Sequence, residues 1–343
     1  LYRNYRFKVV THLERGLSMS IPDTIELEIV KGLCSADCPM CSIGETRWDR
    51  DIMSQETFTQ IIDSFGPSLE QIRRVVLVGI GEALLDKNLG SKIQYLKDRG
   101  IETVGIPTNA SHLTTEVATT ILESGLSEVI IGLDSMNKGV FEGIRKGLNF
   151  EQILENTHKY IEIRDSGHYE SAVMIRMITS DRNVTEWNDY VEYWSKYLDY
   201  SKGDMLLYFP EHNWSEHDYP NEVKISLPGT KAASPFVGED VDLQSRRCAY
   251  VNDRYNIDVH GNLKLCCVDI NASFFELGNV LDTDPVELDN SSVLAQIREL
   301  MSDGRIDEIA PCSKCDVPEN RPLRGYFDGT VLSNKYANEY DYG

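Results

Sequence analysis

Three cysteines lie close together near the start of the chain, in the segment CSADCPMC that runs from Cys34 through Cys38 to Cys41. Because spacings of four and then three residues fit within one short loop, the three thiolates can converge on one soft metal centre. A closed zinc site or a fully ligated four-iron cluster needs a fourth ligand, and the next twenty residues contain no Cys or His. The segment therefore predicts a centre with one open coordination position. A zinc knuckle and a set of buried free thiols are the alternatives.

The composition is that of a globular, acidic protein. The chain has 343 residues, 41% of them hydrophobic, and a formal net charge of -21. This length allows one large domain or two ordinary ones. The acidic excess argues against a nucleic-acid partner, since phosphate binding needs clustered Lys and Arg. It is compatible with a cationic substrate, although the charge could also serve solubility alone.

The sequence shows no sign of export or of membrane insertion. No segment is apolar over the length that spans a membrane, and no basic-apolar signal precedes the first strand-like run. We therefore expect a soluble, cytoplasmic protein without a membrane partner. Eight cysteines are present in a chain too long to need disulfide staples, and their clustering indicates metal binding in a reducing compartment.

Strand-like and helical patterns alternate from Thr24 onward. Runs rich in β-branched or large apolar residues cover 24–33, 74–80, 102–106, 128–133, 172–178 and 205–209. Apolar residues at helical spacing fill the gaps. Six strands, each followed by a helix, predict an α/β fold whose parallel sheet curls toward a barrel. In such barrels functional residues lie at the carboxyl ends of the strands, where Cys34 to Cys41 falls.

The CxxxCxxC spacing and its place after the first strand resemble those of the radical S-adenosylmethionine (radical SAM) enzymes. The resemblance implies a partial (β/α)6 TIM-like barrel. It also implies that Cys34, Cys38 and Cys41 hold three irons of a 4Fe-4S cluster whose fourth iron chelates SAM. In that family an external electron reduces the cluster, and SAM is then cleaved to methionine and a 5'-deoxyadenosyl radical.

Further segments resemble the SAM-binding motifs of that family. Gly79-Ile-Gly81-Glu82 is similar to the GGE motif, whose carboxylate holds the SAM amino group. Thr108-Asn109-Ala110 resembles TNG, with Ala in place of Gly, and Leu133-Asp134-Ser135 resembles SLDG. The residues that the resemblance assigns to SAM are Gly81, Glu82, Thr108, Asn109, Asp134, Ser135, Arg145 and Arg176.

Two arginines are candidates for the SAM carboxylate. Arg145, in a segment similar to the family's IRGG, could pair with that group as a bidentate fork, or could be a solvated helix residue. Arg176 interrupts an apolar strand, so its charge needs a partner inside the barrel. That partner could be SAM, an anionic substrate group or a structural ion pair. Glu211 and His212 follow the sixth strand and could accept a proton at the barrel mouth, or could be exposed loop residues.

A second set of cysteines lies near the C-terminus and consists of Cys248, Cys266, Cys312 and Cys315. A hairpin predicted over 254–266 would present the first two together, and a helix over 293–301 would return the chain to the last two. Four thiolates make a closed site, which by itself fits a structural zinc ion equally well. After a radical SAM barrel, the set resembles the twitch form of the SPASM domain, which binds one auxiliary 4Fe-4S cluster.

Cys267 remains outside both sets. It is either a small buried hydrophobic residue beside a ligand or a hydrogen-atom donor that quenches a substrate radical, as radical SAM epimerases require. The resemblance divides the chain into an N-terminal arm, a radical SAM barrel, a linker or capping loop, a twitch/SPASM-like domain and a tail. These parts are expected at 1–22, 23–220, 221–245, 246–318 and 319–343.

An auxiliary cluster without an open position is expected to take up an electron, which makes the net reaction an oxidation. Twitch-bearing relatives include the 2-deoxy-scyllo-inosamine dehydrogenase. The resemblance thus implies a radical SAM oxidoreductase that dehydrogenates an alcohol on a sugar, cyclitol or similar small molecule. Its partners would be that substrate and an external one-electron reductant such as flavodoxin or ferredoxin. The alternatives are an epimerase, a peptide-crosslinking enzyme and, in another class, a zinc-stabilised non-catalytic binding protein.

Overall fold

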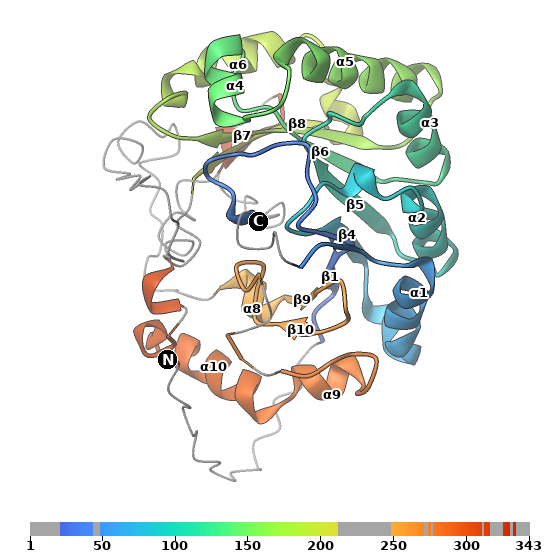
Figure 1. The fold of residues 1–343 in the computed structure, drawn as a ribbon, viewed down its shortest axis with the longest axis vertical. Helices are drawn as coiled ribbons and strands as arrows, with labels where there is room; N and C mark the ends of the chain where they lie inside the picture. Colours follow the sequence, from blue (N-terminus) through green and yellow to red (C-terminus); the bar gives the residue numbers. More distant parts are fainter. Residues whose placement is uncertain are drawn as a thin grey trace.

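The computed structural model describes residues 21–43, 49–211, 248–270, 274–275, 277–310, 312–315, 325–329 and 332–333. Its centre is a curved sheet of ten strands in the order β10-β9-β1-β4-β5-β6-β7-β8-β11-β12 (Figure 1). The six predicted strands form its parallel middle, with bounds that differ from the prediction by a few residues. They are β1 (Thr24–Glu28), β4 (Arg74–Val78), β5 (Thr103–Thr108), β6 (Glu128–Gly132), β7 (Ala172–Thr179) and β8 (Met205–Pro210).

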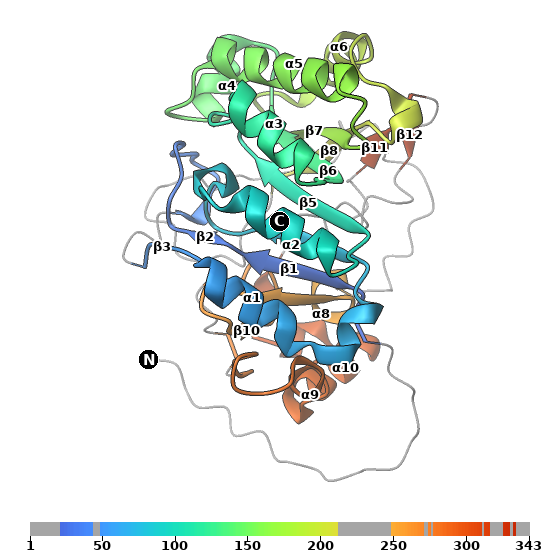
Figure 2. The same cartoon turned by 90° about the vertical axis from the view of Figure 1, so that its right-hand side faces the viewer.

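Helices cover the outer, convex face of this sheet, and α1, α2 and α3 lie side by side across it in Figure 2. The covering helices are α1 (Gln55–Ser64), α2 (Leu89–Asp98), α3 (Thr115–Glu123), α4 (Lys138–Ile144), α5 (Phe150–Ser166) and α6 (Trp187–Trp194). Side-chain caps begin several of them, as where Ser54 Oγ accepts the Thr57 N–H at 3.0 Å. The fold is the predicted partial (β/α)6 barrel.

Successive residues of each strand face opposite sides of the sheet, and this divides the apolar core into two layers. The larger layer packs strands against helices and includes Ile25, Leu27 and Val75. The smaller layer fills the inside of the curved sheet and includes Val76, Ile130 and Met174. The barrel interior is therefore packed at its middle, and space for a ligand remains at the strand ends.

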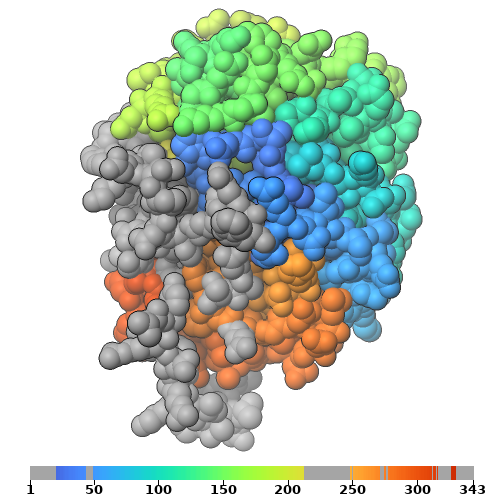
Figure 3. Space-filling view, viewed as in Figure 1, coloured from blue at the N-terminus to red at the C-terminus, as the bar shows by residue number. Residues whose placement is uncertain are grey.

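The cysteine-rich C-terminal region continues the barrel sheet instead of forming a separate sheet. Strand β9 (Arg254–Ile257) pairs in parallel with β1, and β10 (Leu263–Lys264) pairs antiparallel with β9 as the predicted hairpin. In the space-filling view these orange residues lie against the blue N-terminal part of the barrel (Figure 3). The sequence did not predict this pairing because strand patterns do not specify partners across more than two hundred residues.

The remaining described elements surround the two ends of the sheet. A short hairpin of β2 (Val30–Lys31) and β3 (Asp51–Ile52) flanks the cysteine loop, and helices α8 (Ala249–Asn252), α9 (Pro285–Asp289) and α10 (Ser292–Ser302) accompany β9 and β10. Strand β11 (Gly325–Phe327) pairs antiparallel with β8 and with β12 (Leu332–Ser333), so part of the predicted tail extends the sheet.

Short 3-10 helices complete the description and lie at Gly66–Gln71, Ala83–Leu85, Val184–Glu186, Tyr200–Lys202, Ile306–Glu308 and Cys312–Lys314. Nearly all of the predicted N-terminal arm and the whole predicted linker fall outside the described residues. The predicted domain bounds therefore stay predictions. No helix in the described ranges has both the length and the apolar character that crossing a membrane requires.

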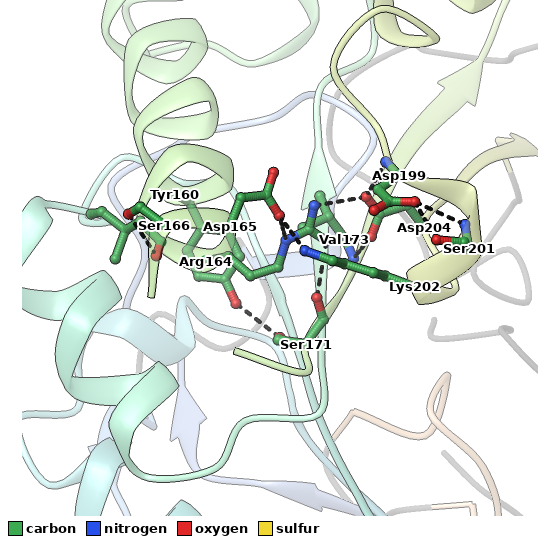
Figure 4. A network of polar contacts seen from close by, with 11 residues as sticks. Tyr160, Arg164, Asp165, Ser166, Ser171, Val173, Asp199, Ser201, Lys202 and Asp204 are labelled. Carbon is green, nitrogen blue, oxygen red and sulfur yellow. Dashed lines mark hydrogen bonds and ion pairs between the residues drawn. The ribbon is translucent and has the colours of Figure 1, made fainter. Parts of the chain in front are cut away.

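A buried ion pair joins α5 to the amino ends of β7 and β8 (Figure 4). The guanidinium of Arg164 binds both carboxylate oxygens of Asp204, and neither side chain is exposed. Asp204 also accepts the backbone N–H groups of Val173 and Asp199, each at 2.8 Å. Because this network lies at the end of the strands away from Cys34, its expected role is to stabilise the barrel.

We therefore predict that Arg164→Met lowers the free energy of unfolding by about 3–5 kcal/mol, because it leaves the Asp204 carboxylate buried without its cation. Urea unfolding followed by circular dichroism measures the change. Lys138→Met is the matched control, since Lys138 and Glu151 form an exposed pair and such pairs contribute little. Equal unfolding midpoints for the two variants would contradict a stabilising role for the buried pair.

Candidate functional site

A cavity of about 160 Å³ opens at the carboxyl ends of the parallel strands. Its wall is built from the cysteine loop after β1 and from residues in the carboxyl-terminal parts of β4 to β8 or just after them, so elements far apart in sequence meet there. Ten of the residues predicted from the sequence line it: Cys34, Cys38, Cys41, Gly81, Glu82, Thr108, Asn109, Arg145, Arg176 and Glu211. The sequence motifs therefore converge on one place.

Backbone contacts hold the cysteine loop in shape. The Cys41 N–H donates to the Cys38 carbonyl at 3.0 Å, and the Asp37 N–H donates to the Lys146 carbonyl at 2.8 Å. The Cys34 sulfur accepts the Ala36 N–H at 3.4 Å and the Asn109 side-chain amide at 3.3 Å. These N–H donors point at sulfur, which favours the thiolate form over the thiol.

Burial has the opposite effect on the thiols. It raises the pKa values of Cys34 and Cys38 and raises that of Cys41 to about 12. For Cys38, the positive charge of Arg145 opposes this rise. Without a metal the three groups would be neutral thiols near pH 7, whereas a bound metal ion deprotonates a coordinating thiol. The loop therefore fits a soft cationic centre that supplies this charge.

A single metal ion and an iron-sulfur cluster place different demands on the distances between ligand sulfurs. Within the described ranges, no three His, Cys, Asp or Glu side chains are gathered closely enough to hold one metal ion. The four sulfurs of a tetrahedral zinc site would lie about 3.8 Å apart, given zinc-sulfur bonds of about 2.3 Å. In an iron-sulfur cluster each iron takes its own thiolate, so the sulfurs stand further apart.

Glu82 is a buried carboxylate that is fixed beside the cysteine loop. One of its oxygens accepts the Thr108 hydroxyl at 2.7 Å and the Leu84 N–H at 3.1 Å, and the other accepts the Asn109 N–H at 2.8 Å. Burial raises the pKa of Glu82, and these hydrogen bonds partly offset the rise. A cationic ligand group in the cavity would compensate the buried charge, as the predicted SAM ammonium would.

The loop before Glu82 packs tightly against the end of β1. The Ile80 N–H donates to a carboxylate oxygen of Glu28 at 2.9 Å, and the Glu82 N–H donates to the Leu33 carbonyl at 2.8 Å. A Cβ atom at Gly81 would lie only 2.5 Å from the Val30 carbonyl oxygen. This close approach explains why a glycine stands there.

Ala110 occupies the position where the TNG motif of the family has glycine, and its backbone has a conformation that favours glycine. Its φ is 60°, in the left-handed region that glycine adopts more easily. The Ala110 N–H donates to the Thr108 hydroxyl at 2.9 Å, and its carbonyl accepts the Asn156 amide at 2.8 Å. The backbone thus keeps the conformation of a glycine motif despite the side chain.

Arg145 is mostly buried and is already paired. Its Nε and Nη2 donate to the two carboxylate oxygens of Asp134 at 2.6 and 3.2 Å, and only 12% of its side chain is exposed. The alternative of a solvated helix residue is therefore wrong. Asp134 occupies the bidentate fork that was predicted to bind the SAM carboxylate. Of the three guanidinium nitrogens, Nη1 is the one that does not bind Asp134.

Asp134 and Ser135 are not part of the described cavity wall. Asp134 is fully buried behind Arg145. Ser135 donates its hydroxyl to a carboxylate oxygen of Glu186 at 2.6 Å, so the structure does not bring it to the cavity. A contact of either residue with SAM stays a prediction. The geometry shows that Asp134 holds Arg145, which does line the cavity.

The candidate proton acceptors are only partly described. Glu211 lines the cavity, and its N–H donates to the Thr179 carbonyl at 3.0 Å. His212 lies outside the described residues. Cys267 is absent from the described cavity wall and follows Cys266 in the second cysteine set.

The second cysteine set gathers as predicted around the hairpin of β9 and β10. Burial raises the pKa of Cys266, and the neighbouring Cys267, Cys248, Cys312 and Cys315 raise it further because they are close enough to repel a thiolate. The Leu263 N–H donates to the Gly278 carbonyl at 2.9 Å, which anchors the hairpin to the segment before α9. Cysteines from three segments therefore lie near Cys266, as the predicted thiolate set requires.

Two buried charges that the sequence analysis missed connect the two cysteine regions. Glu28 in β1 holds the Ile80 N–H and lies 4.0 Å from the Lys264 ammonium. Lys264 is in β10, two residues before Cys266. The signal was the pair Glu26 and Glu28, which alternate with Ile25 and Leu27 in β1. The partner of Glu28 could not be assigned without the pairing of β1 with β9.

Comparison with known families gives two matches. A family model described as the Radical SAM superfamily matches residues 29–215. A second, SPASM, described as an iron-sulfur cluster-binding domain, matches residues 248–316. The two matches contain the two cysteine sets in the order predicted from the sequence.

Sequence relatives include a probable GTP 3',8-cyclase of Methanococcus maripaludis, which is 29% identical over 38% of this chain and 43% of the relative. Molybdenum cofactor biosynthesis protein 1 of Bos taurus is 26% identical over 57% of this chain and 34% of that protein. The chain spans less than half the length of these curated relatives.

Similar solved structures include BtrN in complex with AdoMet and 2-DOIA, with a TM-score of 0.56 and 14% identity, covering 92% of this chain and 99% of that chain. SuiB of Streptococcus suis bound to S-adenosylmethionine has a TM-score of 0.60 and 12% identity, covering 82% and 68%. At such identities the likeness concerns the fold alone.

We predict that Gly81→Ala weakens SAM binding at least about tenfold, because the added Cβ displaces the Val30 carbonyl or the loop that carries Glu82, and such overpacking costs about 1–3 kcal/mol. Equilibrium dialysis with labelled SAM measures the change. Gly143→Ala is the control, since a Cβ there meets nothing within 4 Å and alanine favours the helix. Unchanged SAM affinity in Gly81→Ala would contradict the role assigned to this loop.

Proposed function

This chain belongs to the radical SAM superfamily, and from that premise we propose that it dehydrogenates an alcohol on a sugar-like or cyclitol-like small molecule. The family and the SPASM match give it SAM and two 4Fe-4S clusters as cofactors. A zinc-stabilised binding protein is set aside on the same ground. The oxidation and its substrate class are the proposal.

The observation that carries the proposal is the proximity of the four cysteines of the second set. Cys248, Cys266, Cys312 and Cys315 supply four thiolates, one for each iron of a four-iron cluster. Such a centre has no vacant iron for a substrate, so electron transfer is the function left to it. The first set supplies three thiolates and faces the cavity. One open and one closed centre suit a reaction that removes a hydrogen atom and then an electron.

The residues of the cavity have separable tasks in this proposal. When bound, SAM and the two clusters supply the hydrogen-atom abstraction and take up the electron that an oxidation leaves over. Glu82 would hold the SAM ammonium, and Arg176 would bind the SAM carboxylate or an anionic substrate group. Glu211, on the same wall, would accept the hydroxyl proton as the carbonyl forms.

The sequence relatives favour a second candidate. Proteins named GTP 3',8-cyclase match part of the chain at 27% to 29% identity, which supports a cyclisation of a nucleotide. Their matches cover about two fifths of this chain, whereas the similarity to BtrN, solved in complex with AdoMet and 2-DOIA, covers 92% of it. The cyclases have the higher sequence identity, and BtrN has the greater coverage. They indicate different substrates, so GTP and candidate alcohols are tested in one assay.

The partners follow from the charge and the chemistry. A net charge of -21 favours a cationic substrate such as an amino sugar. The first centre needs an external one-electron donor, and a flavodoxin or a ferredoxin would serve. The assignment of the C-terminal domain to the twitch form and of the chain to the cytoplasm are parts of the same proposal.

The test is anaerobic reconstitution followed by reaction with SAM, a reductant and candidate substrates deuterated at the carbinol carbon. We expect deuterium in 5'-deoxyadenosine and one ketone formed per SAM consumed, with amino sugars or amino cyclitols as the active class. GTP is included in the same screen. Conversion of GTP to a cyclised product without a ketone from any alcohol would overturn the proposal in favour of the cyclase.

Cys267→Ser separates oxidation from epimerisation in that assay. A dehydrogenase keeps both deuterium transfer and product formation, because it needs no hydrogen-atom donor. An epimerase keeps deuterium transfer but loses turnover, and that result would contradict the proposed dehydrogenation.

A further inference from the structure

We propose that Arg145, held in place by Asp134, raises the reduction potential of the cluster bound by Cys34, Cys38 and Cys41. The inference rests on the proposed function in one respect, the assignment of that cysteine set to the cluster. It adds a second task to a residue that the family resemblance assigns only to SAM.

The contact that motivates it is between the guanidinium and a cluster ligand. Arg145 Nη1 donates to the Cys38 sulfur in a long hydrogen bond of 3.9 Å. Arg145 and Cys38 also line the same cavity. A hydrogen bond to a ligand sulfur withdraws negative charge from the iron centre, and such bonds are among the factors that set cluster potentials.

The guanidinium cannot easily leave this position. Asp134 binds two of its nitrogens, and one oxygen of Asp134 also accepts the Ile178 N–H at 2.8 Å. The Asp134 carbonyl accepts the Asn183 side-chain amide at 2.7 Å. On its other side, Arg145 lies against Gly132, where a Cβ atom would come within 2.9 Å of Nη2. The positive charge of Arg145 is therefore held in place by Asp134, and the absence of a side chain at Gly132 leaves room for its guanidinium.

The orientation of the pair determines the sign of the effect. Arg145 lies between Asp134 and Cys38, so the positive member of a buried ion pair is nearer to the sulfur. Reduction adds negative charge to the centre, and a nearby cation in a medium of low polarity stabilises that charge. Asp134 partly cancels the effect because its own charge has the opposite sign. Removing either member alone should thus shift the potential, in opposite directions.

The test is a redox titration of the anaerobically reconstituted enzyme, followed by electron paramagnetic resonance of the reduced signal that SAM perturbs. In Arg145→Gln we expect the equilibrium constant for one-electron reduction to fall at least tenfold, which is about 59 mV for a one-electron couple. In Asp134→Asn the potential should rise, because the cation loses its counter-charge. The double variant should lie above Arg145→Gln.

The matched control is Arg74→Gln. Arg74 forms an ion pair with Glu128. Glu128 begins β6 and Gly132 ends it, so this pair lies at the end of the sheet away from the cysteine loop. Loss of Arg74 should therefore leave the reduction potential unchanged. Iron and sulfide contents verify that each variant is loaded. The inference is overturned if the reduction potentials of Arg145→Gln and Asp134→Asn both stay within the range of the control, or if both move in the same direction. Either result leaves the proposed function standing. A wild-type protein without a SAM-sensitive cluster signal overturns the proposed function together with the inference.

Discussion

The constraint on which the structure depends is the burial of three cysteine thiols together on one cavity wall. Burial disfavours their ionised form, so the site is electrostatically incomplete until a cationic centre is bound. The surrounding residues are arranged for that event. Asn109 and the Ala36 N–H donate to one sulfur, and Arg145 donates to another. The rest of the barrel serves to bring these donors to the cysteine loop.

The two cysteine regions are also linked directly to each other. Because β9 extends the sheet beside β1, the auxiliary hairpin is part of the barrel wall and not a loosely tethered unit. Arg254 in β9 pairs with Glu26 in β1, and Lys264 in β10 faces Glu28. Glu28 in turn holds the loop that precedes Glu82. The two cysteine regions are therefore joined by strand pairing and by buried ion pairs between β1 and the hairpin of β9 and β10.

Much of this was predictable from the sequence, and the exceptions have physical reasons. Local patterns predicted the six parallel strands, the cysteine loop and the hairpin, because each depends on residues near in sequence. The pairing of β1 with β9 and of β8 with β11 was not predictable, since both depend on partners far along the chain. Likewise, Arg145 lies in the cavity wall, but its pairing with Asp134 and its contact with Cys38 could not be predicted because they depend on the folded positions of three segments.

We propose that Cys34, Cys38 and Cys41 hold a cluster with an open iron and that the second set holds a closed one. The most direct test is Mössbauer and paramagnetic resonance spectroscopy of the anaerobically reconstituted protein, beside a variant with all three cysteines replaced by alanine. The account predicts that the variant loses about four irons and four sulfides together with the whole SAM-sensitive signal, and retains the other cluster. A variant that keeps the SAM-sensitive signal, or a wild-type protein that holds zinc and no inorganic sulfide, would contradict it.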